Sequence, residues 1–173
     1  MSAAEVKPGY KVTEVGVIPE DWEVRRLSDI AMISSGGTPD RKNRLYWDGH
    51  IPWVTTSQID FGVIEHAIEF ITQKGLESSA ARVYPSGTLL MAMYGQGKTR
   101  GKIAILGIPA AVNQACAAIG IREETLGEFV FYNLTHRYDE IRGLSNLGNQ
   151  ENLNSGIISS ILVPLPPLPE QRA

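Results

Sequence analysis

The stretch GTLLMAMY, residues 87–94, is a short and mostly apolar run that begins with a glycine. Two similar runs follow it, GKIAIL at residues 101–106 and ACAAIGI at residues 115–121. Short apolar runs that are separated by glycine- or proline-containing loops are typical of buried β-strands. The centre of the chain is therefore predicted to form the core of a β-sheet.

Around this centre the sequence predicts a few helices. Residues 27–33 place apolar side chains on roughly one helical face, and residues 126–141 repeat apolar residues at helical spacing. Thr72 is a candidate N-cap for a short helix that extends to about residue 81. Further strands are expected at residues 51–55 and 162–165, and polar loops at residues 38–50 and 143–154. This order predicts a mixed α/β (α+β) domain with an irregular, largely antiparallel sheet.

Length and composition fit one globular domain with its own hydrophobic core. The chain has 173 residues, of which 43% are hydrophobic and 20% charged. Its single cysteine, Cys116, excludes a disulfide framework and favours a reducing compartment. No apolar run is long enough to span a membrane, and the first residues do not resemble a secretory signal. We therefore expect a cytoplasmic protein with no membrane partner.

The charge is unevenly distributed along the chain. The formal net charge is -3, but residues 78–122 carry five basic and no acidic side chains. Within that segment Lys98, Arg100 and Lys102 alternate with other residues, and a second basic group at residues 41–44 follows Gly36-Gly37-Thr38-Pro39. Such groups are compatible with solvated loops, and they are also typical of a surface that binds a polyanion.

Motifs of catalysis are absent or incomplete. Gly97-Lys98-Thr99 resembles the end of a phosphate-binding P-loop, but Ala92 stands where the first glycine is required and a strand is expected to follow. The three histidines have no metal-ligand spacing, and Cys116 lies in an apolar run that predicts an inert, buried thiol. We therefore expect no catalytic residues and no metal site, which favours a binding module over an enzyme.

Three segments are candidates for contacting DNA. Arginine and lysine neutralise phosphates or bind guanine, whereas asparagine and glutamine match the edge of adenine. Ordinary turn chemistry also explains an asparagine-rich loop, so that alternative stays open. The candidate residues are Arg41, Lys42 and Arg44 in the first segment, Tyr94, Gln96, Lys98, Thr99, Arg100 and Lys102 in the second, and Asn149, Gln150 and Asn152 in the third.

A set of short motifs in fixed order resembles the specificity subunit of type I restriction–modification enzymes. Any one of the motifs is weak, but the set is specific and extends from about Gly16 to Gln171. The motifs are Gly16-Val17-Ile18-Pro19 with Trp22, Leu27-Ser28-Asp29-Ile30, Gly36-Gly37-Thr38-Pro39, Tyr46-Trp47-Asp48-Gly49 with Ile51-Pro52-Trp53, Asn113-Gln114-Ala115, Gln150-Glu151-Asn152-Leu153, and Pro164-Leu165-Pro166-Pro167-Leu168-Pro169-Glu170-Gln171.

The resemblance implies a target recognition domain that reads one half of a split double-stranded DNA site. It implies a noncatalytic role, in which DNA adenine methyltransferase (modification) subunits bind S-adenosylmethionine and a restriction subunit uses ATP and Mg. The framework motifs are expected to build and aim the loops, while base readout falls to more individual loop residues. The implied organisation is a recognition domain at residues 16–166 and the start of a truncated spacer helix at 167–173, so that the chain is expected to be a fragment of a full subunit or of a half subunit. Residues 1–15 are polar and lack periodicity, which predicts an N-terminal arm.

Two other functions remain as alternatives. The domain could mainly dock protein, as an assembly module of the methyltransferase complex, and leave DNA reading to a second domain. A nucleotide-dependent enzyme built on Gly97-Lys98-Thr99 would instead require ATP to raise thermal stability, and we expect no such shift.

Overall fold

The computed structural model describes residues 6–95, 97–146 and 151–173. Its centre is a five-stranded sheet with the strand order β4-β12-β9-β10-β6. These strands are β4 (Ala31–Ser35), β12 (Cys116–Ile121), β9 (Leu89–Ala92), β10 (Ile103–Leu106) and β6 (Val63–Ile64). The three central strands predicted from the sequence are thus neighbours, and β9 pairs antiparallel with both β12 and β10. Only β6 joins this sheet in parallel, beside β10.

A second sheet of four strands packs against the first, in the order β7-β5-β11-β8. It consists of β7 (Glu69–Ile71), β5 (Trp47–Val54), β11 (Ala110–Val112) and β8 (Val83–Tyr84), with β11 and β5 parallel and the other pairs antiparallel. Two separate pairs lie nearer the termini: β1 (Tyr10–Thr13) with β2 (Gly16–Pro19), and β3 (Glu23–Arg26) with β13 (Leu162–Leu165). The predicted mixed α/β class with a largely antiparallel, irregular sheet is confirmed.

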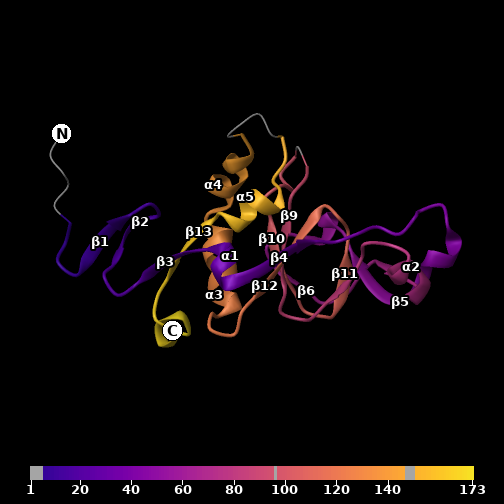
Figure 1. Cartoon of the computed structure of the whole chain (residues 1–173), viewed down its shortest axis with the longest axis horizontal. Helices are drawn as coiled ribbons and strands as arrows, with labels where there is room; N and C mark the ends of the chain where they lie inside the picture. The colour runs from indigo at the N-terminus through magenta and orange to yellow at the C-terminus, as the bar shows by residue number, and fades with distance from the viewer. Residues whose placement is uncertain (1–5, 96, 147–150) are drawn as a thin grey trace.

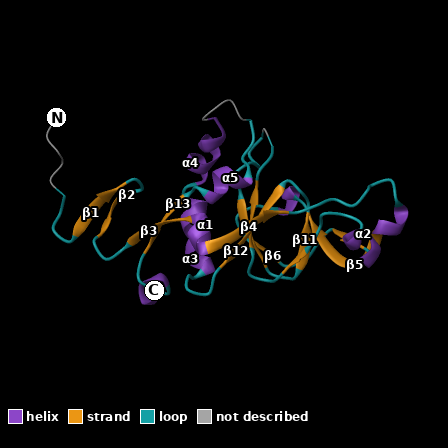
Figure 2. Ribbon diagram, viewed as in Figure 1, coloured by secondary structure: helices purple, strands orange, loops and turns teal. Residues whose placement is uncertain are grey.

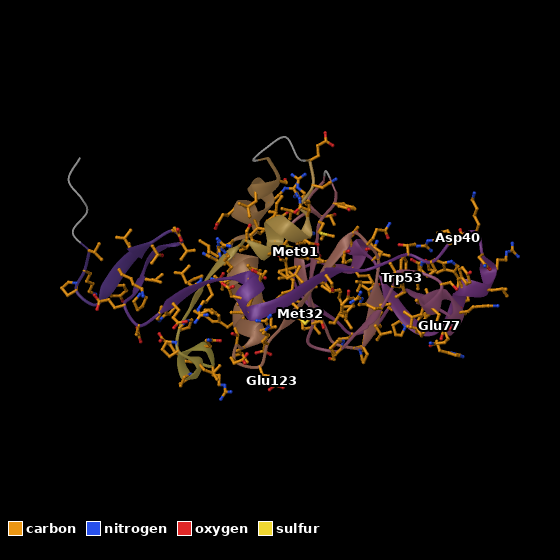
Figure 3. All side chains as sticks on the ribbon, in the orientation of Figure 1. Met32, Asp40, Trp53, Glu77, Met91 and Glu123 are labelled. Carbon is orange, nitrogen blue, oxygen red and sulfur yellow. The ribbon has the colours of Figure 1, made fainter. Side chains whose placement is uncertain are left out.

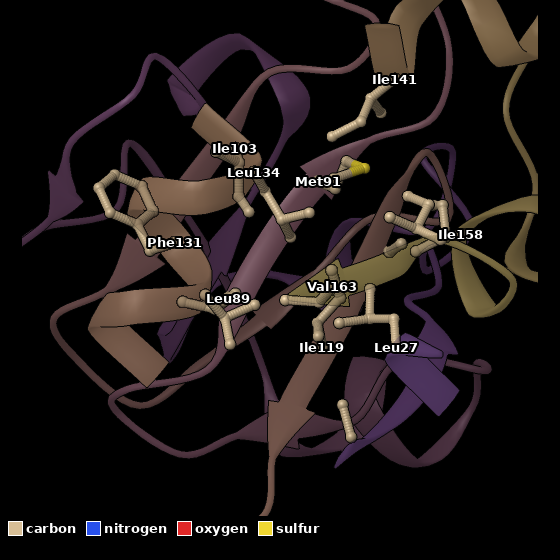
Figure 4. Close-up of a cluster of buried hydrophobic side chains, with 14 of the residues drawn as sticks. Leu27, Leu89, Met91, Ile103, Ile119, Phe131, Leu134, Ile141, Ile158 and Val163 are labelled. Carbon is tan, nitrogen blue, oxygen red and sulfur yellow. The ribbon is translucent and has the colours of Figure 1, made fainter. Parts of the chain in front are cut away.

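Helices and the second sheet cover opposite faces of the first sheet (Figure 2). The helices on one side are α1 (Leu27–Ile30), α3 (Gly127–His136), α4 (Tyr138–Gly143) and α5 (Ser155–Ser159). Figure 4 shows Phe131 and Leu134 of α3 in one cluster with Leu89, Met91 and Ile103 of the sheet. Helix α2 (Gln73–Glu77) lies on the far side of the second sheet (Figure 1).

Burial on both faces explains the continuous apolar sequence of β9. Leu89 and Met91 belong to the core beneath the helices, while Leu90 and Ala92 belong to the core between the two sheets. Successive side chains of a strand point to opposite faces, so a strand that is covered on both sides needs apolar residues at every position. Fully burying one such aliphatic side chain stabilises the fold by about 1.5–3 kcal/mol.

The first and the last of the predicted helices differ from expectation. The segment at residues 27–33 forms a helix only over Leu27–Ile30, because the following residues pair as β4 with β12, where Ile33 lies opposite Ile119. The predicted helix at residues 126–141 is divided into α3 and α4 at Arg137, which has φ -98° and ψ 22°. Arg137 donates a hydrogen bond from Nη1 to the carbonyl of Leu162 at 2.6 Å, so a contact with β13 accompanies the break.

Other local differences follow from close contacts. Thr72 is the N-cap predicted for α2, with its hydroxyl accepting from the N–H of Gly75 at 3.0 Å, but the helix ends at Glu77. A side chain at position 75 would approach the carbonyl of Tyr46 to 2.6 Å, which explains a glycine inside this helix. Strand β5 begins at Trp47, inside the predicted loop at residues 38–50, after a 3-10 helix at Arg44–Tyr46.

Both ends of the chain carry secondary structure. The expected N-terminal arm contains β1, which forms a hairpin with β2 that extends away from the helices and sheets (Figure 1). The short helix α6 (Leu168–Gln171) follows the proline-rich segment. Its Gln171 accepts a hydrogen bond from the N–H of Leu126 at 2.9 Å, and Glu170 accepts one from the indole of Trp22 at 3.2 Å. The domain boundaries expected at residues 15 and 166 remain predictions.

Candidate nucleic-acid interface

The second candidate segment, residues 94–102, is the loop between the adjacent strands β9 and β10 (Figure 1). The first and last residues of the loop continue the pairing of the two strands. The N–H of Gly101 donates to the carbonyl of Ala92, and the N–H of Ala92 donates to the carbonyl of Lys102, both at 2.9 Å. Gly95 and Gly101 have φ angles of +121° and +88°, a region that side chains disfavour. The glycines of the segment therefore permit a tightly folded loop. Gln96 lies outside the described residues.

The third candidate segment lies beside this loop. The N–H of Leu153 donates to the carbonyl of Met93 at 2.9 Å, and the guanidinium of Arg100 donates to the carbonyl of Glu151. Asn152 stands between these two contacts and is exposed. The structure thus joins the second and third segments, although Asn149 and Gln150 lie outside the described residues. We refer to residues 94–102 and 151–153 together as the joined loops.

The cations of the joined loops have different environments. Lys98 is exposed, and no residue that the structure describes forms an ion pair with its ammonium group. Lys102 instead pairs with Asp60, with 2.6 Å between Nζ and Oδ1, and lies above the ring of Phe61. Arg100 uses its guanidinium in the link between the loops. Lys98 is therefore the basic side chain of this site that is most available for a phosphate.

Tyr94 and Thr99 complete the predicted residues of the second segment. Tyr94 is exposed to 44%, and Thr99 is half-buried next to the backbone of Gly95. The segment thus carries both an exposed aromatic ring and an exposed cation, which are side-chain types that bind nucleotides, because bases stack on aromatic side chains and phosphates attract ammonium groups.

Two residues of α4 bind the backbone of residues 97–100, and no sequence motif marks them as part of the site. The hydroxyl of Tyr138 donates to the carbonyl of Lys98. Arg142 donates to the carbonyl of Arg100 at 2.9 Å and to that of Gly97. Their helical spacing does not distinguish them from the residues of an ordinary helix, because a loop 40 to 45 residues earlier in the chain provides their acceptors.

The first candidate segment is placed apart from the joined loops. Figure 3 shows Asp40 and Trp53 toward the end of the molecule that carries α2, whereas the joined loops lie beside α4. Arg41 is held there, with its guanidinium 4.0 Å from the ring of Trp47 and paired with Glu69 through two hydrogen bonds. Lys42 and Arg44 are exposed.

The glycine pair before this segment has a clear structural reason. The N–H of Gly37 donates to the carbonyl of Val112 at 2.9 Å, and its own carbonyl accepts from the indole of Trp53 at 3.0 Å. A side chain at position 36 would lie 2.0 Å from the carbonyl of Val112. Gly36 and Gly37 thus let the chain pass directly over β11, which sets the direction of residues 38–44.

The rejected motifs have unsuitable geometry for catalysis. Gly97-Lys98-Thr99 is followed by β10 and not by a helix, so the motif lacks the helix that begins directly after a P-loop. Burial raises the pKa of the Cys116 thiol to about 12, which keeps it protonated and unreactive. Within residues 6–95, 97–146 and 151–173, no group of three or more His, Cys, Asp or Glu side chains is placed to hold a metal ion.

A cleft of about 540 Å³ lies elsewhere, between β3, α1 and the segment that leads to α6. Asp21, Glu23, Asp29 and Glu124 line it together with Arg25 and Arg122, so it carries charges of both signs. This mixture does not favour a polyanion.

In the part of the chain that the structure describes, no helix has the length and apolarity needed to cross a membrane.

Solved structures share this fold. The HsdS subunit of Thermoanaerobacter tengcongensis superposes with a TM-score of 0.68 at 21% identity, over 95% of this chain and 38% of that one. Curated relatives include the type I restriction enzyme MjaIX specificity subunit of Methanocaldococcus jannaschii, which is 27% identical over 94% of this chain and 38% of its own length. The EcoR124I/EcoR124II specificity subunit of Escherichia coli is 22% identical over 87% and 38%, respectively.

The family is established by a profile match over most of the sequence. Residues 19–173 match the type I restriction modification DNA specificity domain. The chain belongs to this family, which confirms the resemblance seen in its motifs. It spans about 38% of the length of the relatives named above.

Proposed function

We propose that this chain is a DNA-reading domain that recognises one half of a bipartite target. The observation that carries the proposal is the joined loops, where Lys98 and Asn152 are both exposed on segments tied by Arg100 and Leu153. An ammonium group binds phosphate whatever the sequence, while a primary amide offers the donor and acceptor that match a base edge. The family, whose description is a DNA specificity domain, supports the same assignment.

The domain would be noncatalytic and act within a larger complex. The two curated relatives are named as specificity subunits of type I restriction enzymes, and this chain corresponds to a little over a third of each. We propose that DNA adenine methyltransferase subunits and a restriction subunit are its partners, and that they bind S-adenosylmethionine, ATP and Mg. The domain itself then needs no cofactor.

Sequence selection tests the proposal directly. The chain is incubated at low salt with a pool of randomised duplexes, and the bound fraction is sequenced over successive rounds. We expect enrichment of one short motif. Binding without enrichment would contradict sequence reading.

A protein-docking role is the second candidate, and the hairpin β1–β2 favours it. Val12 and Val17 lie opposite each other on this hairpin and are 69% and 58% exposed, respectively. Two-stranded hairpins are marginally stable alone, so an exposed apolar face is a possible contact for a partner. Absence of any DNA binding in the selection, together with binding to the methyltransferase subunits, would support this role instead.

A further inference from the structure

Two side chains of helix α4 donate three hydrogen bonds to the backbone of residues 97–100. The carbonyls of Gly97 and Arg100 accept from the guanidinium of Arg142, and the carbonyl of Lys98 accepts from the hydroxyl of Tyr138. A side chain at position 101 would lie 3.4 Å from Cβ of Arg142, an ordinary contact distance, so the loop lies directly against the helix. Three carbonyls within four residues are thereby directed at α4.

The helix that makes these contacts is itself firmly fixed. Ile141, next to Arg142, has no exposed surface and belongs to the core under the helices. The ring of Tyr138 packs edge-on against Phe61, with 5.2 Å between the ring centroids. At the start of α4, Arg137 bonds to Glu140 and to the carbonyl of Leu162. The loop is therefore tied to a rigid part of the domain.

We propose that Arg142 and Tyr138 are positioning residues for DNA sequence discrimination. They hold the backbone of residues 97–100, and Arg100 transmits this order to the segment that carries Asn152. Neither residue needs to touch DNA in this role. The inference rests on the proposed function, because it assigns to α4 the geometry of the loops that would read the bases.

Loss of this geometry affects two kinds of binding differently. Attraction between lysine and phosphates depends on charge and tolerates a mobile loop. Base contacts require side chains held to within about 0.5 Å of the productive geometry, and a mobile loop must also be ordered on binding. Removing the α4 contacts should therefore weaken binding to the selected sequence more than binding to random sequence.

The first experiment measures loop order without DNA. Arg142→Lys keeps the positive charge but loses the forked pair of donors, and Tyr138→Phe keeps the ring against Phe61 but loses the hydroxyl. Arg82→Lys is the matched control, since Arg82 is exposed and outside the joined loops. We expect amide hydrogen exchange at Gly101 and Lys102 to become faster in both α4 variants and to stay unchanged in the control. Unchanged exchange in both α4 variants would overturn the proposed restraint.

The second experiment measures discrimination as the ratio of dissociation constants for random and selected duplexes. We expect each α4 variant to lower this ratio by about tenfold, the effect of losing one hydrogen bond to a charged or constrained group. Binding to random duplex and its salt dependence should stay within about twofold, because Arg142→Lys and Tyr138→Phe preserve charge. A general loss of folded protein would lower binding to both duplexes alike, and that result or an unchanged ratio would overturn the inference.

The two experiments separate this inference from the proposed function. If the parent chain selects no sequence, the proposed function fails and the role in discrimination fails with it. The exchange measurement then still decides whether α4 orders the loop. If the parent chain selects a motif and the α4 variants keep the ratio, only the positioning role is wrong.

Discussion

Arg100 donates a hydrogen bond to the backbone carbonyl of Glu151, 51 residues later in the chain. The contact joins a loop with an exposed cation to a loop with an exposed amide, and the bond from Leu153 to Met93 holds the second loop in place. Arg100 belongs to the basic run of the sequence, yet its guanidinium acts within the protein. A basic run in a sequence therefore predicts a polyanion-binding surface, but it does not identify which of its cations the protein uses for its own internal contacts.

Lys98→Ala should weaken binding to every duplex, because Lys98 is the exposed cation of the joined loops. One lost phosphate contact lowers the slope of log affinity against log salt by about 1. Fluorescence titrations over a range of salt concentrations measure this slope. Lys7→Ala removes the same charge far from the loops and should leave the slope as it is. An unchanged slope for Lys98→Ala would exclude Lys98 as a phosphate contact.

Asn152→Ala should relax sequence preference and leave binding to random duplex nearly intact. Asn154→Ala is a close control, because Asn154 caps α5 by accepting from the N–H of Ile157 at 2.8 Å. Loss of such a cap costs about 1 kcal/mol of stability. Selection with each variant distinguishes loss of sequence preference from loss of stability. The control should unfold at a lower denaturant concentration but still select the same DNA motif. A uniform loss of affinity across sequences would instead place Asn152 in the framework. Gln150→Ala carries the same prediction of relaxed preference.

Arg41→Ala should lower the free energy of unfolding by about 1 kcal/mol, because its guanidinium stacks on Trp47 and pairs with Glu69. Lys42→Ala removes an adjacent exposed cation and should stay within about 0.5 kcal/mol of the parent chain. Urea unfolding measures the free energy of unfolding of both variants. Equal stability of the two variants would show that the contacts of Arg41 contribute nothing measurable to the fold.

Cys116 should resist thiol reagents in the folded protein at mildly alkaline pH. Burial raises its pKa from 9.0 to about 12, so the reactive thiolate is scarce until the chain unfolds. Because the folded pKa is the higher one, this group's contribution to stability is complete below pH 9 and is lost as the pH rises toward about 12. Labelling rates with and without urea provide the measurement. Rapid labelling of the folded chain would contradict the burial of this thiol.

The sequence predicts best those elements whose cause is local or periodic. β9, β10 and β12 were evident because burial on both faces produces unbroken apolar runs, and Thr72 was evident because a cap acts within its own turn. The end of α1 was not evident from the sequence, because it depends on the pairing of Ile33 with Ile119, far along the chain.

The same distinction applies to the candidate site. The types of residue that could contact DNA were visible, but their grouping depends on hydrogen bonds between distant segments. Arg41 and Lys42 are neighbours in the sequence, and both are exposed. Only the positions of Trp47 and Glu69 show that the guanidinium of Arg41 is held by contacts within the protein. Tyr138 and Arg142 could not be found without the loop they hold.

The antiparallel pairing of β3 with β13 has a mechanical consequence. Glu23 lies opposite Leu165, so the chain enters and leaves the ribbon at the same end. Tension between the segments before β3 and after β13 would load the residue pairs of the ribbon one after another, as in unzipping. Such a pull would therefore open the ribbon one residue pair at a time, which takes less force than breaking all of its pairs together.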